Sequence, residues 1–516
     1  MPMHPSRRLF LAASAATLAG CASTRSRGPA IVRADRPAIP FGVASGDVTA
    51  DSAIIWSRTD RPAKMLVEWS TTESFQEYEN AFGPVATPAT DFTAQCDLRS
   101  LPANQRIFYR VSFMSLADAK AVSEPVTGTF RTAPLAAHDL KFAWSADTVG
   151  QGWGINLESG GIRIYETIRS MSPDFFIHSG DNINADQPVE PEIRLPDGTV
   201  WKNLTTPAKS KVAETLDEFR GNYQYNLLDE NIRRFNASIP VYSQWDDHEV
   251  HNNWYPGQIL DDPAYKIERS IDVLAARARQ AYLEHMPLRR CIEEPGRIYR
   301  NYSCGPLAEL FILDERSYRG PNNQNRQKEM SPECAFLGRA QLNWLMRKLG
   351  ESKATWKIIA SDMPIGYVCG DGPGRYDGCA NGDDGPPGGR EFEIADLLSH
   401  CKRQAIRNLV FLTAALHHPS AVRYEPDRAA FKDFDPFWEC VTGPLHAGAA
   451  GPNPLDKTFG PEIAWHLAPP YPSTGPAAGH AFFGMVTIDA KTGTLTVRQY
   501  DVNGREVHKI EVEARV

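Results

Sequence analysis

The hydrophobic and polar positions divide the chain into two regions with different patterns. Between Phe41 and about Thr132, short runs rich in β-branched and aromatic residues alternate with turn residues, as in Ala53–Arg58, Met65–Ser70 and Ile107–Phe113. Such runs are typical of strands, and several strands within about 90 residues are typical of a small β-sandwich. This region has no cluster of catalytic residue types. We therefore expect residues 41–134 to form an N-terminal all-β sandwich domain that packs against, or covers, a catalytic domain.

From residue 135 onward, short apolar runs alternate with longer amphipathic segments. The runs that read as buried strands are Leu140–Trp144, Phe175–His178, Val241–Gln244, Leu310–Leu313, Lys357–Ala360 and Leu409–Leu412. Helices are predicted at Ile162–Met171, Lys209–Tyr223, Asp272–His285 and Gln341–Leu349. This alternation predicts an α/β sheet with functional loops at the strand ends. Two further runs, Phe482–Ile488 and Thr494–Tyr500, predict a C-terminal hairpin.

The N-terminal residues 1–21 have the features of an export signal. Arg7 and Arg8 precede a short apolar run of small residues, which is typical of a twin-arginine signal peptide. Leu18–Cys21 also matches a lipoprotein cleavage box, so Cys21 is either an acylated new N-terminus or a chance cysteine in a plain signal peptide. The run is about half the roughly 20 residues that a spanning helix needs. Residues 22–40, rich in Ser, Arg and Pro, are expected to be a linker.

Composition and charge exclude several classes of protein. Hydrophobic residues make up 42% and charged residues 23% of the 516 residues, which is ordinary for a globular protein. The net charge of -8 gives no reason to expect nucleic-acid binding. None of the nine cysteines forms a CxxC pair, which argues against a zinc ribbon. Cys369 and Cys379 are the first candidates for a disulfide, and the Gly-rich stretch between them is either an ordered loop near the active face or a flexible insertion.

Acidic and imidazole side chains follow four of the predicted strands. They are Asp147, Asp181, the pair Asp247 and His248, and His417. A rigid sheet can fix the positions of side chains that follow its strands directly. Carboxylates and imidazoles suit divalent metal ions. Two adjacent metal ions would lower the pKa of a water molecule and neutralise the charge of a phosphoryl group during in-line attack. Four such loops in one chain therefore predict a metal-dependent hydrolytic site.

Four segments carry a resemblance to a known family: Phe41–Asp47, Gly180-Asp181, Trp245–Asn253 and Phe482–Asp489. In these segments the chain resembles the alkaline phosphatase D (PhoD-like) family of calcineurin-like metallophosphoesterases, over nearly the whole mature sequence. The resemblance implies a four-layer α/β/β/α catalytic domain spanning residues 135–516. It also implies two adjacent metal ions and phosphomonoesterase or phosphodiesterase activity.

The resemblance also implies roles for individual residues. Asp147 and His417 would hold the first metal ion, Asp181 would bridge both, and Asp247 would hold the second. His248, which can titrate near neutral pH, would protonate the leaving-group oxygen or stabilise the charge on the phosphoryl group. Four residues are candidates for substrate contacts: Asn252 or Asn253, which could instead complete the second metal site, and Arg316 and Arg319, which could instead form surface salt bridges.

Three positions depart from the family pattern. Asn184 stands where the family usually has a tyrosine, which as a phenolate favours ferric iron, so Ca²⁺, Mn²⁺, Mg²⁺ or Zn²⁺ is expected instead. Asp147 stands where many members have cysteine. Ala415 stands where an aspartate is usual, and His418 could replace that ligand only through a local shift.

The leading hypothesis is an exported, periplasmic phosphoester hydrolase that uses a metal-activated hydroxide, attached to the membrane if Cys21 is acylated. Its expected partners are the twin-arginine export machinery and a small phosphoester or a phospholipid substrate. Asn184 and Ala415 motivate an alternative, a degenerate member that binds ligand or envelope components without turnover. A third possibility is a phospholipid head-group diesterase, which a lipid-anchored enzyme could reach directly.

Overall fold

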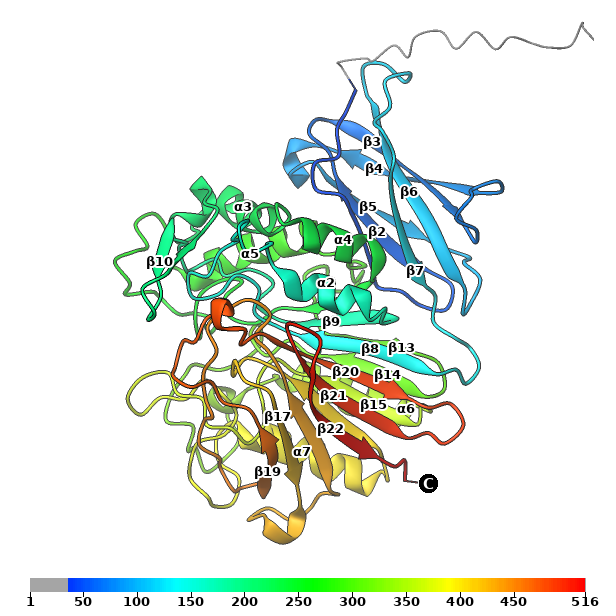
Figure 1. Ribbon diagram of the computed structural model, residues 1–516. Helices are drawn as coiled ribbons and strands as arrows, with labels where there is room; N and C mark the ends of the chain where they lie inside the picture. The colour runs from blue at the N-terminus through cyan, green and yellow to red at the C-terminus, as the bar shows by residue number, and fades with distance from the viewer. Residues whose placement is uncertain (1–35, 516) are drawn as a thin grey trace, which may run out of the picture. The chain divides into compact units, whose positions relative to one another are not determined.

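The computed structural model describes residues 36–515, and Pro37–Val516 forms one compact unit (Figure 1). The predicted signal peptide, which includes Cys21, and most of the predicted linker lie outside the described residues. Within the described part of the chain, no helix has both the length and the apolar character needed to cross a membrane.

The catalytic region is built on two large mixed sheets. The first has nine strands in the order β22 (Glu506–Val512), β21 (Leu495–Asp501), β20 (Phe482–Ile488), β8 (Leu140–Ser145), β9 (Phe175–Ser179), β12 (Val241–Gln244), β1 (Val43–Gly46), β2 (Ala53–Arg58) and β5 (Thr93–Leu98). The second has seven, in the order β13 (Arg300–Ser303), β14 (Ala308–Ile312), β15 (Trp356–Ala360), β16 (Leu409–Thr413), β18 (Phe437–Val441), β17 (Ser420–Tyr424) and β19 (Pro461–His466). Parallel strands occupy the middle of both, so their carboxyl ends lie along one edge of each sheet.

Both faces of the central strands are buried, because successive side chains point to opposite faces. In β8, Phe142 and Trp144 belong to the core between the two sheets, whereas Ala143 packs under the helices that cover the first sheet. In β15, Ile358 faces the core between the sheets and Ile359 faces the helices that cover the second. The result is a four-layer α/β/β/α arrangement, which confirms the predicted fold class.

The α-helices of the described residues are α2 (Arg163–Ser170), α3 (Leu216–Asn226), α4 (Glu230–Ser238), α5 (Ile271–His285), α6 (Arg339–Glu351) and α7 (Glu391–Arg403). Four of them match predicted helices, but α3 begins at Leu216 and not at Lys209. The reason is a capping box in which Thr215 accepts from the N–H of Glu218 while the Glu218 carboxylate accepts from the N–H of Thr215. Two helices, α4 and α7, were not predicted from the pattern.

The N-terminal all-β domain is a sandwich that shares one of its sheets with the catalytic region. Its separate sheet has the order β4 (Glu79–Ala86), β3 (Ala63–Ser70), β6 (Arg106–Ser115) and β7 (Val126–Arg131). Its other sheet consists of β1, β2 and β5, which extend the nine-stranded sheet. The joint is narrow, because β1 pairs with β12 only between Gly46 and Val241.

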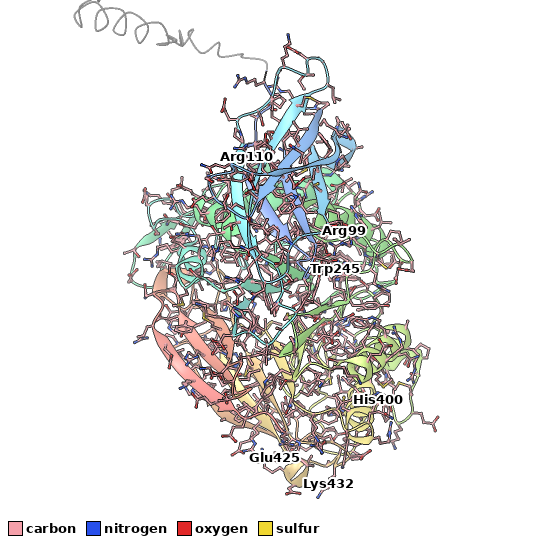
Figure 2. All side chains as sticks on the ribbon, turned by 90° about the vertical axis from the view of Figure 1, so that its right-hand side faces the viewer. Arg99, Arg110, Trp245, His400, Glu425 and Lys432 are labelled. Atoms are coloured by element: carbon pink, nitrogen blue, oxygen red, sulfur yellow. The ribbon has the colours of Figure 1, made fainter. Side chains whose placement is uncertain are left out.

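Side-chain burial separates the interior from the surface in the expected way. In Figure 2, Glu425 and Lys432 lie at the lower edge of the molecule. Trp245 is fully buried and donates through Nε1 to Asp314 at 2.9 Å. It directly precedes the Asp246-Asp247-His248 segment. The segment is therefore anchored by a buried ring immediately before its first residue.

Candidate metal centre

The predicted ligands converge at the carboxyl ends of β8, β9, β12 and β16. Asp147, Asp181 and His417 each follow a strand by two to four residues and have positive φ angles of 68°, 51° and 58°. A non-glycine residue rarely adopts this left-handed conformation, and such residues cluster at functional sites, where surrounding contacts hold them. The sharp turn after each strand thus directs the side chain toward the other members of the group.

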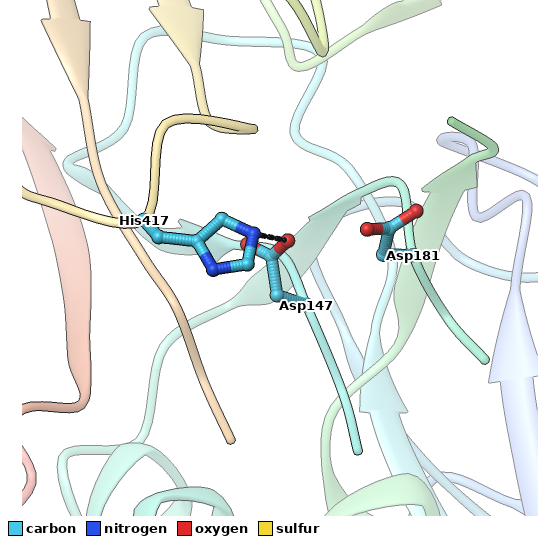
Figure 3. Close-up of side chains that lie close together, drawn as sticks. All are labelled: Asp147, Asp181 and His417. Carbon is cyan, nitrogen blue, oxygen red and sulfur yellow. Dashed lines mark ion pairs between the residues drawn. The ribbon is translucent and has the colours of Figure 1, made fainter. Parts of the chain in front are cut away.

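Two groups of donor atoms form, and they share one residue. The first group is Asp147, Asp181 and His417; the second is Asp181, Asp247 and His248. Within each group the donor atoms lie within 4.8 Å of one another, and all five side chains are buried. Figure 3 shows the first group, with His417 Nε2 directed at Asp147 Oδ1 at 2.8 Å. The shared position of Asp181 is the arrangement that a bridging ligand requires.

The charges in the centre call for a cation. Burial raises the pKa of Asp181 well above its usual range, and the nearby carboxylates of Asp247, Asp246 and Asp147 raise it further. Burial would also raise the pKa of Asp147, but the charge of His417 outweighs it and leaves that pKa below its usual range. Carboxylate oxygens and imidazole nitrogens are ligands of divalent cations. The residues present therefore fit one or two such cations.

His248 is held by an aspartate that the sequence analysis did not select. Its Nδ1 lies 2.7 Å from Asp186 Oδ1, and Asp186 Oδ2 accepts a hydrogen bond from the N–H of Asn252 at 2.9 Å. Burial would lower the pKa of His248, but the charges of Asp186 and Asp247 raise it to about 10. The expectation that His248 titrates near neutral pH is therefore wrong, because the imidazole sits between carboxylates. No local pattern marks Asp186, which lies in the loop after β9.

Glu249 connects the loops that carry the second donor group. Its Oε2 accepts from the N–H groups of Asp181 at 3.2 Å and Asp246 at 2.8 Å. Its Oε1 accepts from the N–H of Asn182 at 2.6 Å and from the Asn182 side chain at 2.9 Å. The side chain is fully buried. One carboxylate thus fixes the loop after β9 relative to the loop after β12, a role that its place in the sequence motif did not reveal.

A cavity of about 290 Å³ opens above the ligands. Asn252 and Asn253 line it, and the N–H of Asn253 donates to Asp247 Oδ2 at 2.7 Å. Four carboxylates line it as well, but among the described lining residues the only Lys or Arg side chain is Arg316. The uncharged amides are thus placed to contact a substrate, while the wall around them is predominantly acidic.

The two candidate arginines are occupied by the protein itself. Arg316 donates through Nε to Asp246 at 2.8 Å and through both terminal nitrogens to Asp377 at 2.8 and 2.9 Å. Arg319 does not line the cavity; it is fully buried and bonds to Asn322 and the Asp377 carbonyl. Neither arginine forms a surface salt bridge, and Arg319 is not placed to contact a substrate, because the acidic loop around Asp377 engages both.

The positions that depart from the family pattern do not provide a substitute for the carboxylate that is absent at Ala415. Ala415 lines the cavity. His418 does not; its Nδ1 lies 3.1 Å from the Leu416 carbonyl oxygen and its ring is edge-on to Tyr367. Asn184 is buried and also lies outside the lining. Neither His418 nor Asn184 therefore replaces the missing carboxylate at the cavity wall.

The stretch from Cys369 to Gly389 is an ordered part of the site. Cys369, Gly370 and Asp377 line the cavity, and Arg390 anchors the stretch through the carbonyl oxygens of Tyr376 and Asp377, each at 2.8 Å. Cys369 and Cys379 are buried free thiols, contrary to the expected disulfide. The arginine contacts hold this loop in place without a covalent link.

Comparisons with known proteins identify a family for this chain. Residues 142–499 match the PhoD-like phosphatase family, and residues 22–134 match its N-terminal domain. Alkaline phosphatase D of Bacillus subtilis (strain 168) is 27% identical over 346 residues, which are 63% of this chain. The match spans only 56% of that relative's length.

Two solved structures share the fold. A structure of PhoD superposes with a TM-score of 0.68 at 22% identity and covers 91% of this chain and 92% of its own. The purple acid phosphatase PPD1 from yellow lupin (Lupinus luteus) seeds gives a TM-score of 0.55 at 12% identity, with 93% and 74% covered. At these identities the two structures support the fold alone. From the family match over most of its length, the chain belongs to the PhoD-like phosphatase family of phosphoester hydrolases, built on the metallophosphoesterase fold.

Proposed function

We propose that this protein hydrolyses phosphoesters with the help of divalent cations held by the two donor groups. The observation that carries the proposal is the convergence of five buried acidic and imidazole side chains from four separate strand-end loops, with Asp181 shared between the groups. Asp147 and His417 would hold one cation and Asp247 the other. Bound there, divalent cations would polarise the phosphoryl group and lower the pKa of an attacking water.

The protein's own contribution beyond the ligands is a positioned proton donor. The Asp186 carboxylate fixes His248 through Nδ1, so that Nε2 lies 4.0 Å from Asp247 Oδ1 at the cavity wall. With a pKa of about 10, the imidazole carries a proton at neutral and mildly alkaline pH. It can therefore protonate the leaving-group oxygen as the ester bond breaks.

The lack of a free cationic side chain at the cavity wall favours phosphodiesters over phosphomonoesters. A diester carries one negative charge and a monoester close to two, and among the described lining residues no Lys or Arg side chain is free to pair with the second charge. Arg316, the one cationic side chain among the described lining residues, is already engaged by Asp246 and Asp377. The amides of Asn252 and Asn253 can contact an uncharged part of the substrate. A phospholipid head group meets these requirements as one kind of diester.

The experiment uses the mature protein with p-nitrophenyl phosphate, bis-p-nitrophenyl phosphate and a panel of divalent cations. We expect turnover only with added cation, higher kcat/KM for the diester, and loss of activity in His248→Ala. His138→Ala, an exposed histidine outside the site, is the matched control and should keep full activity. Turnover that is absent with every cation would contradict the proposal. If the cations bind but no substrate is hydrolysed, the degenerate binding protein motivated by Asn184 and Ala415 would be favoured.

Export belongs to the same proposal. Arg7 and Arg8 in the predicted signal support transport by the twin-arginine machinery into the periplasm, and Cys21 supports a lipid anchor. Cell fractionation of the native chain and an Arg7→Lys, Arg8→Lys variant tests the transport. We expect the variant to stay in the cytoplasm. A Cys21→Ser variant that remains in the membrane fraction as firmly as the native chain would exclude the anchor.

A further inference from the structure

A second cavity lies behind the metal-binding loops, on the helix-covered face of the nine-stranded sheet. Its volume is about 70 Å³. It forms where the two parts of that sheet separate, because β1 and β12 pair only between Gly46 and Val241. At Gly46 the strands are so close that a β-carbon would lie 2.5 Å from the Val241 carbonyl oxygen. Ala44, two residues earlier, lines the cavity.

The walls are largely aromatic, and two of the rings are the imidazoles of His178 and His285. Rings line much of the cavity, among them Trp56, Phe176, Tyr223 and Phe235. Asn182 and Asn226 add amide groups. No Asp, Glu, Lys or Arg occurs among the described residues that line it. Burying a charged ligand there would be costly without an ionic partner, so the walls select an uncharged molecule.

Tyr223 supplies a hydrogen-bonding group that no described residue satisfies. The residue is 3% exposed, and its hydroxyl has no partner in the part of the chain that the structure describes. The ring stacks on His285 with centroids 5.0 Å apart, which restricts its orientation. Because buried hydroxyls nearly always have a partner, this one needs water or a ligand. At about 10–15 Å³ for each water, the cavity has the volume of roughly five to seven water molecules.

The cavity adjoins two of the metal ligands in sequence. Thr148 and Asn182 line it and directly follow Asp147 and Asp181. The Thr148 N–H donates to the Asp181 carbonyl oxygen at 2.9 Å, and its hydroxyl lies 3.0 Å from His178 Nε2. Asn182 contacts Glu249, the residue that fixes the loop after β12. A molecule in the cavity therefore touches the backbone turns that position both donor groups.

We propose that this cavity is an effector site for a small uncharged ring compound with a hydroxyl group that pairs with Tyr223. An occupant changes the affinity of the metal centre through Thr148 and Asn182. The coupling is reciprocal, so a bound metal ion changes the affinity of the cavity by the same factor, expected to be about fivefold or more.

Phenol is the probe, and its binding to the mature protein is measured by calorimetry and by the shift in Tm. We expect saturable phenol binding, and no binding of benzoate, which has a similar ring but carries a charge. Tyr223→Phe keeps the ring and removes the hydroxyl, and should weaken phenol binding about tenfold. Ala44→Met should fill the cavity and abolish binding. Tyr78→Phe, an exposed tyrosine of the sandwich, is the matched control and should bind phenol normally.

Three results would overturn the site: no saturable phenol signal, equal binding of benzoate, or unchanged binding in Tyr223→Phe. The last of these carries the test even if Ala44→Met fails to fold. The coupling is tested by titrating Mn²⁺ with and without saturating phenol. The Mn²⁺ affinity should change in the native chain and stay constant in Tyr223→Phe at the same phenol concentration. An affinity that phenol leaves unchanged in the native chain would overturn the coupling.

Discussion

The two halves of the metal centre are held in different ways. Around Asp247 and His248, buried side chains fix the ligands: Glu249 binds the backbone of both loops, and Asp186 binds the imidazole. Around Asp147 and His417, the side chains are fixed mainly by backbone conformation and by a contact to a backbone carbonyl. Both residues have left-handed conformations, and His417 Nδ1 contacts the Gly448 carbonyl oxygen at 2.7 Å.

The two halves therefore differ in how far they are preorganised for metal binding. The half around Asp247 is preorganised by a network of charge-assisted hydrogen bonds, which persists whether or not a cation is bound. The half around Asp147 lacks a carboxylate at Ala415, so it depends more on the cation itself. We therefore expect the two halves to differ in affinity, with the half around Asp247 the tighter site.

The largest effect is expected from Asp181→Asn, which weakens both halves at once. The substitution keeps the size of the side chain but removes the charge that the two donor groups share. Catalytic rate should fall about 1000-fold or more, and metal analysis should show loss of cation from both halves. Asp261→Asn, an exposed aspartate outside the site, is the control. Retention of one tightly bound cation at full occupancy would contradict a shared role.

The next effect tests the network of the tighter half. In Glu249→Gln, an amide NH₂ would face backbone N–H donors, so at least one of the present hydrogen bonds must be lost. We expect metal affinity to fall about 10- to 100-fold. The half around Asp247 should then no longer bind a cation more tightly than the half around Asp147. Isothermal titration with Mn²⁺ measures this directly. Glu329→Gln, an exposed glutamate, should titrate like the native chain. If the tighter affinity survives in Glu249→Gln, the network does not account for the difference.

The pH dependence of kcat/KM tests the protonation of His248. Its pKa is raised, so the proton-donating imidazolium is present below about pH 10 and is lost as the pH rises through that value. Asp186→Asn removes one of the charges responsible but can still accept a hydrogen bond from Nδ1. The alkaline limb of kcat/KM should therefore move to lower pH by about 1 unit or more. An alkaline limb at the same pH in both proteins would show that Asp186 does not set the pKa of this proton donor.

The smallest effect is expected from Ala415→Asp, which adds the carboxylate that the first half lacks. Residue 415 has a φ of 56°, a conformation that aspartate tolerates better than most residues. Metal affinity of the first half should rise about tenfold, because more ligand charge tightens divalent binding. Without metal the variant should unfold at a lower temperature than the native chain, because the new carboxylate adds to the repulsion. Titration curves that show no tightening would mean that residue 415 is not at the ligand position.

Local patterns identified most of the secondary structure but missed some elements. The strands at Val241–Gln244 and Phe482–Ile488 matched their predicted ranges, because a buried strand is a short apolar run with clear ends. α4 has two buried residues, Ile232 and Phe235, and this weak pattern was not recognised. The start of α3 was misplaced because its capping box, and not its hydrophobic pattern, decides where the helix begins.

The sequence alone indicated an α/β sheet and the acidic and imidazole residues that converge, since strand patterns and the residues that follow strands are local features, and the family resemblance added the four-layer arrangement. It did not determine what each charged group contacts. Asp186 became the partner of His248, and Arg316 was taken up by Asp246 and Asp377 only in the folded chain. Asp377 is 61 residues from Arg316 in the chain. Such pairings depend on which loops the sheets bring together and on how far burial removes water from the charged groups. A local sequence pattern predicts neither of these.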